Sequence, residues 1–167
     1  RLASCPTPKG RGGRLSGRYH DCQITLIDDS SNASPASMAA TIASMTATAP
    51  TIMILSEMRE LGDATATEHA ALMPHINGLS PRLVIALGSA MHDALGGLDD
   101  TIVAIAAPST KDAVQVLEDA VEDGDIIFIK GSLGSGSWRV RDAISASFET
   151  ASSPETSSQN GGDNHAA

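Results

Sequence analysis

The stretch of sequence that decides the fold is Leu83-Val84-Ile85-Ala86-Leu87, which holds five apolar residues and no polar one. A strand with one face in water alternates apolar and polar side chains, and this stretch does not. Its shortness and its Val and Ile favour a strand over a helix. The stretch therefore predicts a strand covered on both faces, as in a parallel sheet.

Working outward from residues 83–87, further apolar runs alternate with helical patterns. Strands are predicted at 24–27, 52–55, 101–105 and 126–129, and helices at 34–45, 65–76, 90–95, 109–121 and 140–148. Ser34 suits the cap of its helix and Pro35 its first position. Pro74 is expected to strain the last turn of the helix at 65–76. The alternation predicts an α/β fold with a Rossmann-like, mainly parallel sheet and helices on both faces.

The two ends of the chain have a different composition. Gly, Pro and Arg dominate residues 1–22, which predicts loop. Residues 150–167 are mostly Ser, Thr, Asn, Gly and Ala, and we expect them to be disordered. A single domain over 23–149 is therefore predicted, a length typical of one domain. Because the chain starts with Arg1 rather than Met, we expect further residues to precede it.

Composition narrows the class of protein. Hydrophobic residues make up 41% of the chain but aromatic residues only 2%, so an aliphatic core is predicted. The net charge of −9 argues against a general nucleic-acid or anionic-membrane role. Two cysteines make neither a disulfide framework nor a zinc site, and the five histidines have no metal-ligand spacing. With no apolar run long enough to span a membrane and no signal peptide pattern, a cytoplasmic protein is predicted.

Ligands of parallel sheets bind beyond the carboxyl ends of the strands, so the residues there are candidates. The segment Asp28-Asp29-Ser30-Ser31-Asn32-Ala33-Ser34-Pro35 joins a predicted strand to a helix N-terminus, where an anion or a ribose-phosphate can bind. Asp29 can accept a hydrogen bond from a ribose hydroxyl. Ordinary turn and cap chemistry explains the same residues equally well.

Two more strand ends carry polar residues. Lys130 precedes a glycine-rich loop, 131–136, whose backbone can approach a small carboxylate or phosphate. Glu57 lies in an acidic segment, 56–63, that either faces an amine substrate or forms a solvated turn, and chemistry alone favours the turn. His69 is expected to be a packing or capping residue. The three lysines each precede Gly or Asp, so the chain has no P-loop, which requires Lys followed by Ser or Thr.

Taken in order, four segments resemble the Mur ligases, and most closely the members that add D-alanyl-D-alanine. Gly13-Arg14 and the segment 26–38 are similar to a G-R followed by D-D-S-Y-N-A-N-P. The family's G-D-M-x-E-L-G with a downstream His is similar to the segment 57–62 followed by Glu68-His69. Its V-G is similar to Leu87-Gly88, and its K-G-S-R to Lys130-Gly131-Ser132. This chain departs from the family pattern at Ser31, Ser34, Ser56 and Leu133, which stand in place of Tyr, Asn, Gly and Arg.

The resemblance implies a fold, a reaction and site residues. Residues 23–149 would be the C-terminal domain, which closes over the active site, and 1–22 a remnant of the preceding ATP-binding domain. ATP, with Mg²⁺, would phosphorylate the terminal carboxylate of UDP-N-acetylmuramoyl-tripeptide, and the amine of D-alanyl-D-alanine would attack the acyl phosphate. The nucleotide-binding residues would be Arg14, Asp29 and Asn32, and the substrate-binding residues Glu57, Lys130 and Ser132. Without a P-loop, the chain is expected to be inactive alone.

Other hypotheses stay open from the sequence. Another muramoyl-amino-acid ligase or a folylpolyglutamate synthase has the same three-domain plan, although the D-D-S-x-N-A-x-P string favours the D-alanyl-D-alanine enzyme. A non-catalytic Rossmann-like binding module, or a decayed copy of the ligase domain, agrees equally well with the missing P-loop and the four substitutions.

Overall fold

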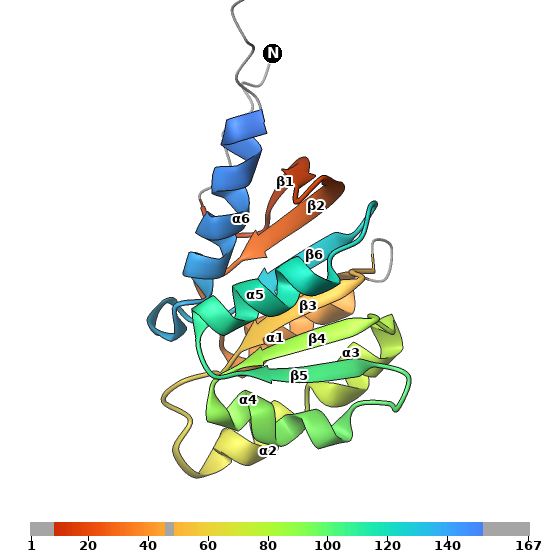
Figure 1. Ribbon diagram of the computed structural model, residues 1–167. Helices are drawn as coiled ribbons and strands as arrows, with labels where there is room; N and C mark the ends of the chain where they lie inside the picture. The colour runs from red at the N-terminus through yellow and green to blue at the C-terminus, as the bar shows by residue number, and fades with distance from the viewer. Residues whose placement is uncertain (1–8, 46–48, 152–167) are drawn as a thin grey trace, which may run out of the picture.

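The computed structural model describes residues 9–45 and 49–151, which form one six-stranded sheet with helices on both faces (Figure 1). The strand order is β1-β2-β6-β3-β4-β5. Only β1 and β2 pair antiparallel; the other four pairs are parallel. The predicted mainly parallel α/β fold is confirmed.

The strands and helices have the following bounds. The strands are β1 Gly13–Tyr19, β2 Cys22–Asp29, β3 Ile52–Ser56, β4 Leu83–Leu87, β5 Val103–Ala107 and β6 Ile126–Lys130. The helices are α1 Pro35–Ala43, α2 Thr65–Ala70, α3 Met73–Leu79, α4 Ser89–Ala94, α5 Thr110–Ala120 and α6 Ser137–Ala151. Short 3-10 turns are η2 Gly62–Ala64, η3 Leu95–Gly97 and η4 Leu133–Ser135. No helix among the described residues is long and apolar enough to cross a membrane.

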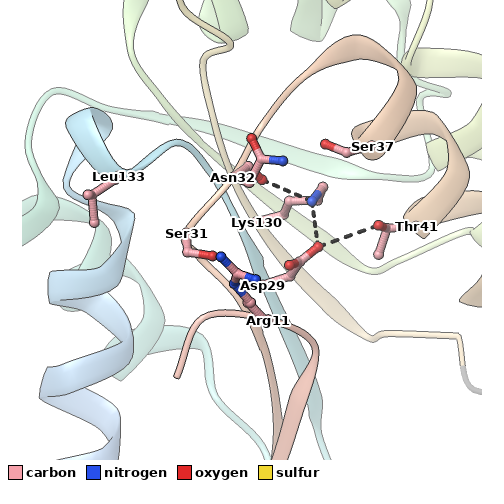
Figure 2. A pocket seen from close by; sticks show the side chains of 8 residues that line it. All are labelled: Arg11, Asp29, Ser31, Asn32, Ser37, Thr41, Lys130 and Leu133. Atoms are coloured by element: carbon pink, nitrogen blue, oxygen red, sulfur yellow. Dashed lines mark hydrogen bonds and ion pairs between the residues drawn. The ribbon is translucent and has the colours of Figure 1, made fainter. Parts of the chain in front are cut away.

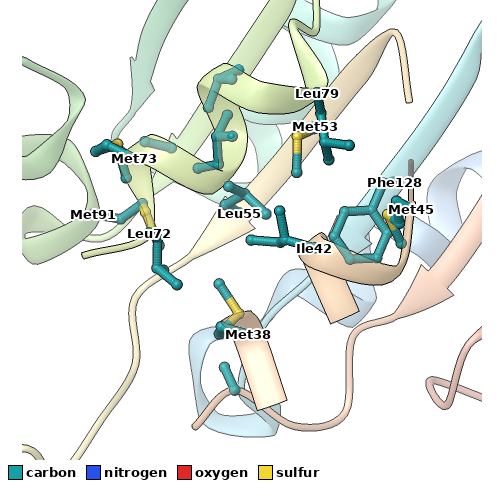
Figure 3. Packing of buried hydrophobic residues seen from close by; sticks show 14 of the residues in the cluster. Met38, Ile42, Met45, Met53, Leu55, Leu72, Met73, Leu79, Met91 and Phe128 are labelled. Carbon is teal, nitrogen blue, oxygen red and sulfur yellow. The ribbon is translucent and has the colours of Figure 1, made fainter. Parts of the chain in front are cut away.

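Each face of the sheet has its own apolar core. On one face, residues of α1, α3 and α4 pack against β3, β4 and Phe128 of β6; Figure 3 shows this methionine-rich cluster. On the other face, residues of α5 and α6 pack against all six strands (Figure 1). Every residue of β4 is buried, as its unbroken apolar sequence predicts. Methionine fills irregular space well, which suits a core with so few aromatic rings.

The prediction of loop over residues 1–22 is wrong for Gly13–Tyr19, which form β1. The strand pattern is hidden in the sequence because one inward position is glycine. A Cβ on Gly17 would lie 2.6 Å from the ring of Phe148, so only glycine lets α6 pack this closely. Tyr19, the next inward residue, is buried. Residues 1–8 of that predicted loop lie outside the described residues.

Two helix predictions are also corrected. The predicted helix 65–76 is two helices, α2 and α3, which are separated at residues 71–72. Pro74 lies in the first turn of α3, where no backbone donor is needed, so it does not strain a last turn. α6 runs to Ala151, two residues into the stretch predicted to be disordered. The rest of that stretch, 152–167, lies outside the described residues.

Helix α1 starts as its sequence predicts. The Oγ of Ser34 accepts a hydrogen bond from the backbone N–H of Ser37, and the Oγ of Ser37 accepts one from the N–H of Ser34. Pro35 occupies the first turn. This capping box fixes the point at which the chain leaves the β2–α1 loop, which is the loop that carries most of the candidate site.

Candidate functional site

Neighbouring strands β2 and β6 send the chain to opposite faces of the sheet. After β2 the chain enters α1, which packs on the methionine-rich face. After β6 it enters α6, which packs on the other face. Where two adjacent parallel strands diverge in this way, their loops separate and leave a crevice for a ligand. The structure therefore predicts a binding site at the carboxyl ends of β2 and β6.

A pocket of about 590 Å³ lies at this crevice (Figure 2). It is lined by Arg11, Asp29, Ser31, Asn32, Ser37, Thr41, Lys130 and Leu133. These residues come from the segment before β1, the ends of β2 and β6, the β2–α1 loop, α1 and the β6–α6 loop. Of the six residues that the sequence singles out for binding, three line this pocket: Asp29, Asn32 and Lys130.

Lys130 is a buried residue of the pocket that links its neighbouring segments. Its side chain is only 1% exposed, and its Nζ forms an ion pair with Oδ2 of Asp29. The same Nζ donates a hydrogen bond to the backbone carbonyl of Asn32 at 3.0 Å. The hydroxyl of Thr41 donates to Oδ2 of Asp29 at 3.4 Å. Lys130 thus ties the end of β6 to the β2–α1 loop and to α1, and its charge is already paired.

Asp28 is a site residue that the sequence reasoning missed. It is buried, and it points to the opposite face of the sheet from Asp29 because successive strand residues alternate. Its carboxylate accepts hydrogen bonds from the backbone N–H of Gly10 at 2.7 Å and from the hydroxyl of Ser30 at 2.6 Å, and it pairs with Arg141 at 3.7 Å. Asp28 therefore orders the loops around the pocket, a role that the doublet of aspartates at a strand end could have suggested.

The segment before β1 brings a cation that the sequence reasoning also missed. Arg11 lines the pocket, between Gly10 and Gly12, whose φ angles are +80° and +74°. The hydroxyl of Ser31 donates to the carbonyl of Gly10 at 2.6 Å, so this serine ties the segment to the β2–α1 loop. Arg14, the predicted nucleotide contact, is exposed on β1 opposite Ile27 and does not line the pocket.

A second pocket, of about 430 Å³, adjoins the first and shares Asn32 with it. Its lining residues are Asn32, Ala33, Arg59, Glu60, Ser132 and Gly134. Ser132, a predicted substrate contact, therefore lies beside the first pocket. Its Oγ is shielded from solvent and has no hydrogen-bond partner among the described residues.

Glu57 lies outside both pockets. Gly88 has a φ of +90°, and a Cβ there would lie 2.5 Å from the carboxylate of Glu57, so the acid packs against the backbone at the start of α4. His69, which lies in α2, is fully buried. Its Nε2 accepts from the backbone N–H of Met58 at 2.8 Å, and its Nδ1 lies 2.7 Å from the carbonyl of Thr65. One N–H and one lone pair satisfy both contacts, so the expected packing role of His69 is confirmed.

Close packing explains one glycine of the loop after β6. A Cβ on Gly131 would overlap the hydroxyls of Ser56 and Ser137. The hydroxyl of Ser135 lies 2.7 Å from that of Ser56 and donates to the carbonyl of Ser132 at 2.6 Å. These serines fold the loop back over the end of β3. In the described part of the chain, no group of three or more His, Cys, Asp or Glu side chains is placed to hold a metal ion.

Comparisons with known proteins agree with this architecture. A family model described as "Mur ligase, glutamate ligase domain" matches residues 13–133. A sequence search among curated proteins gives no match.

Solved structures with the same fold include three ligases. MurF ligase from Thermotoga maritima in complex with ADP has a TM-score of 0.70 and 21% identity, over 90% of this chain and 34% of that one. MurF from Acinetobacter baumannii has a TM-score of 0.66 and 21% identity, over 84% and 31%. The UDP-N-acetylmuramoylalanyl-D-glutamyl-2,6-diaminopimelate–D-alanyl-D-alanyl ligase from Acinetobacter baumannii has a TM-score of 0.68 and 20% identity, over 86% and 30%. This chain thus spans about a third of the length of these structures.

Proposed function

This chain belongs to the Mur ligase family, matching its glutamate ligase domain, and we propose that it is the C-terminal, closing domain of an ATP-dependent ligase. The ligase adds D-alanyl-D-alanine to UDP-N-acetylmuramoyl-tripeptide in peptidoglycan precursor synthesis, in the cytoplasm. The observation that carries the proposal is the crevice at the ends of β2 and β6, where Arg11, Asp29, Asn32 and Lys130 meet. The D-D-S-x-N-A-x-P string at this crevice favours the D-alanyl-D-alanine enzyme over other members of the family.

Each side chain has a distinct part in nucleotide binding. Lys130 and Thr41 both engage Oδ2 of Asp29, while Oδ1 makes no hydrogen bond to the described residues and can accept one from a ribose hydroxyl. Arg11 makes no ion pair with the described residues, so its charge is available to a phosphate. Guanidinium groups bind phosphate oxygens through paired hydrogen bonds and stabilise the charge that develops on them during phosphoryl transfer. Lys130 is a positioning residue, since it acts through Asp29 and Asn32.

Mg²⁺ accompanies ATP in the proposed ligase, but the residues of this crevice do not fit it. Mg²⁺ is held by one or two carboxylates together with phosphates and waters. Asp29 is the carboxylate that lines this pocket, and it is already paired with the ammonium group of Lys130. Arg11 lines the same pocket and adds a second positive charge, which disfavours a cation. We therefore assign this chain no metal ligand.

The 167 residues contain no P-loop, because none of the three lysines is followed by Ser or Thr. A P-loop in another domain would then hold most of the phosphate oxygens of ATP, and this chain would complete the site, with Arg11, when the two domains close. The isolated chain is expected to bind nucleotide weakly and to show no ATP hydrolysis or ligation. ATP hydrolysis or ligation by the purified 167-residue chain would contradict this proposal.

Calorimetry with ADP tests the proposed nucleotide pocket. Arg11→Gln should weaken ADP binding by about tenfold, which corresponds to the loss of one charge-assisted hydrogen bond. Arg18→Gln is the matched control, because Arg18 is an exposed arginine at the far end of β1, and it should bind ADP as the unchanged chain does. The proposal fails if the unchanged chain does not bind ADP, or if the two variants have the same affinity.

A further inference from the structure

Strand β5 forms one edge of the sheet and carries no charged residue. Among the described strands it pairs with β4 alone, so its outer side has no strand neighbour (Figure 1). Val103 is 58% exposed, and Ala104 and Ala106 are exposed as well. The opposite edge differs, because β1 carries Arg14 and Arg18, and charged edge residues discourage pairing with another chain. The edge at β5 has no such protection.

The backbone of β5 has unused hydrogen-bonding groups at this edge. The N–H of Val103 donates to the carbonyl of Arg82 at 3.1 Å, so Val103 and every second residue after it face β4. The backbone groups of Ala104 and Ala106 therefore point away from the sheet, because successive residues of a strand alternate in direction. They form no hydrogen bond with the residues that the structure describes. Two N–H groups and two carbonyls are thus available to another strand.

These groups match a second copy of the same strand that runs in the opposite direction. If the Ile105 residues of the two copies lie opposite each other, Ala104 of each copy faces Ala106 of the other. Both alanines then belong to pairs that exchange two hydrogen bonds each. The two-fold symmetry keeps equivalent faces of the two sheets on the same side, so the exposed Val103 gains apolar neighbours from the second copy.

Charges at the two ends of β5 are complementary in this arrangement. Asp99 and Asp100 precede the strand, Lys111 follows it, and all three are exposed. None of the ion pairs in the described part of the chain involves them. In an antiparallel pair the start of one strand lies beside the end of the other, so the carboxylates of each copy approach the lysine of the other. A parallel pair would bring like charges together instead.

We propose that two copies of this chain associate through their β5 strands, which run antiparallel and join the two sheets into one. A pair of five-residue strands buries much less area than a standard interface, so the dimer is weak, with a dissociation constant of about 10 µM to 1 mM. Strands β3 and β4 separate β5 from β6, and no residue of β5 lines either of the first two pockets. The association therefore leaves these pockets open, and it does not depend on the proposed function.

Sedimentation equilibrium of the 167-residue chain, from about 10 µM to 2 mM, measures the association. The average mass should rise with concentration from that of one chain toward that of two. Amide hydrogen exchange in the same samples locates the contact, since the N–H groups of Ala104 and Ala106 should become at least about twofold more protected at the highest concentration. A chain that stays monomeric throughout, or that associates without protecting these two amides, overturns the inference.

Two matched variants separate the β5 edge from the β1 edge. Val103→Lys places a charge at the junction and should weaken association at least about tenfold, whereas Leu15→Lys, at an exposed apolar residue of β1, should leave it unchanged. Both side chains are already exposed, so both variants should fold and bind ADP as the unchanged chain does. If Val103→Lys associates as tightly as Leu15→Lys, another surface forms the contact and the inference is wrong.

Charge reversal tests the antiparallel direction. Lys111→Glu in one variant, and Asp99→Lys with Asp100→Lys in another, should each weaken self-association about two- to fivefold at low salt, because like charges then meet at both ends. An equimolar mixture of the two variants should associate more tightly than either variant alone, since opposite charges again face each other. A mixture that associates no more tightly than its components contradicts the antiparallel pairing.

Discussion

Burying a charged group is costly unless it is paired and hydrogen-bonded, and Lys130 meets both conditions through Asp29 and Asn32. Lys130→Met would leave the partly buried Asp29 without its partner. We expect it to lower the free energy of unfolding by about 3 kcal/mol, as measured by chemical denaturation. Lys111→Met, at an exposed lysine of α5, is the control and should have little effect. Similar losses in the two variants would refute a structural role for the ion pair.

Tyr19, at the opposite end of the sheet from Lys130, should make the free energy of unfolding depend on pH. Burial, and then the negative charge of Glu118, raise the pKa of the Tyr19 hydroxyl above its ordinary value of 10.0. Because the folded-state pKa is raised, the neutral form favours folding; its contribution is complete below the unfolded pKa and is lost as the pH rises above about 10. The folded chain should therefore lose stability in alkaline solution more steeply than Tyr19→Phe does.

Unfolding curves of the two proteins at matched pH values measure that difference. At neutral pH, Tyr19→Phe should change the free energy of unfolding by less than about 1 kcal/mol, because the buried hydroxyl has no hydrogen-bond partner among the described residues. Parallel alkaline curves for the two proteins would show that Tyr19 does not titrate in this way.

At the scale of elements, the connection after β6 is the most tightly packed part of the site. Gly131→Ala would place a Cβ against the hydroxyls of Ser56 and Ser137. We expect a loss of about 1–3 kcal/mol in the free energy of unfolding, as for other overpacked positions. The double variant Gly131→Ala/Ser56→Gly should regain part of the loss, since one of the two overlaps is removed. No loss in the single variant, or no recovery in the double variant, would contradict the packing described here.

Most elements could be predicted because their sequences carry a pattern. The unbroken apolar run of β4 and the capping residues of α1 are examples, and both predictions are confirmed. Strand β1 could not be recognised, because one of its inward residues is Gly17. The reason for glycine there is the ring of Phe148 of α6, which packs against it only in the folded chain. The break between α2 and α3 likewise depends on tertiary packing, although Pro74 marks it to within a turn.

The grouping of the candidate site residues could be predicted in part for the same reason. Asp29, Asn32, Lys130 and Ser132 follow strand ends and carry the family motif, and the structure brings them together around two adjoining pockets. Arg11 and Arg59 lie in irregular segments whose course is set by glycines and by neighbouring loops. No local pattern places such side chains in a pocket, so only the folded arrangement reveals them.

For the whole molecule, the sheet determines which residues can face a partner domain. The strands β2, β6 and β3 end side by side, so the loops after them gather at one edge and form both pockets. The α5–α6 face and the methionine-rich core lie away from this edge and hold the strands in register. This arrangement suits a domain that supplies one side of an active site and closes against another domain that holds ATP.

The central claim is that ADP binds at the carboxyl ends of β2 and β6. A titration of the 167-residue chain with ADP, followed by the backbone amide signals, measures this directly. The account predicts that the largest shifts fall on the segment around Arg11 and on Asp29, Ser31 and Asn32, and that Arg11→Gln reduces them. Saturable shifts that instead cluster at the β4 and β5 strand ends, or no shifts at all, would contradict it.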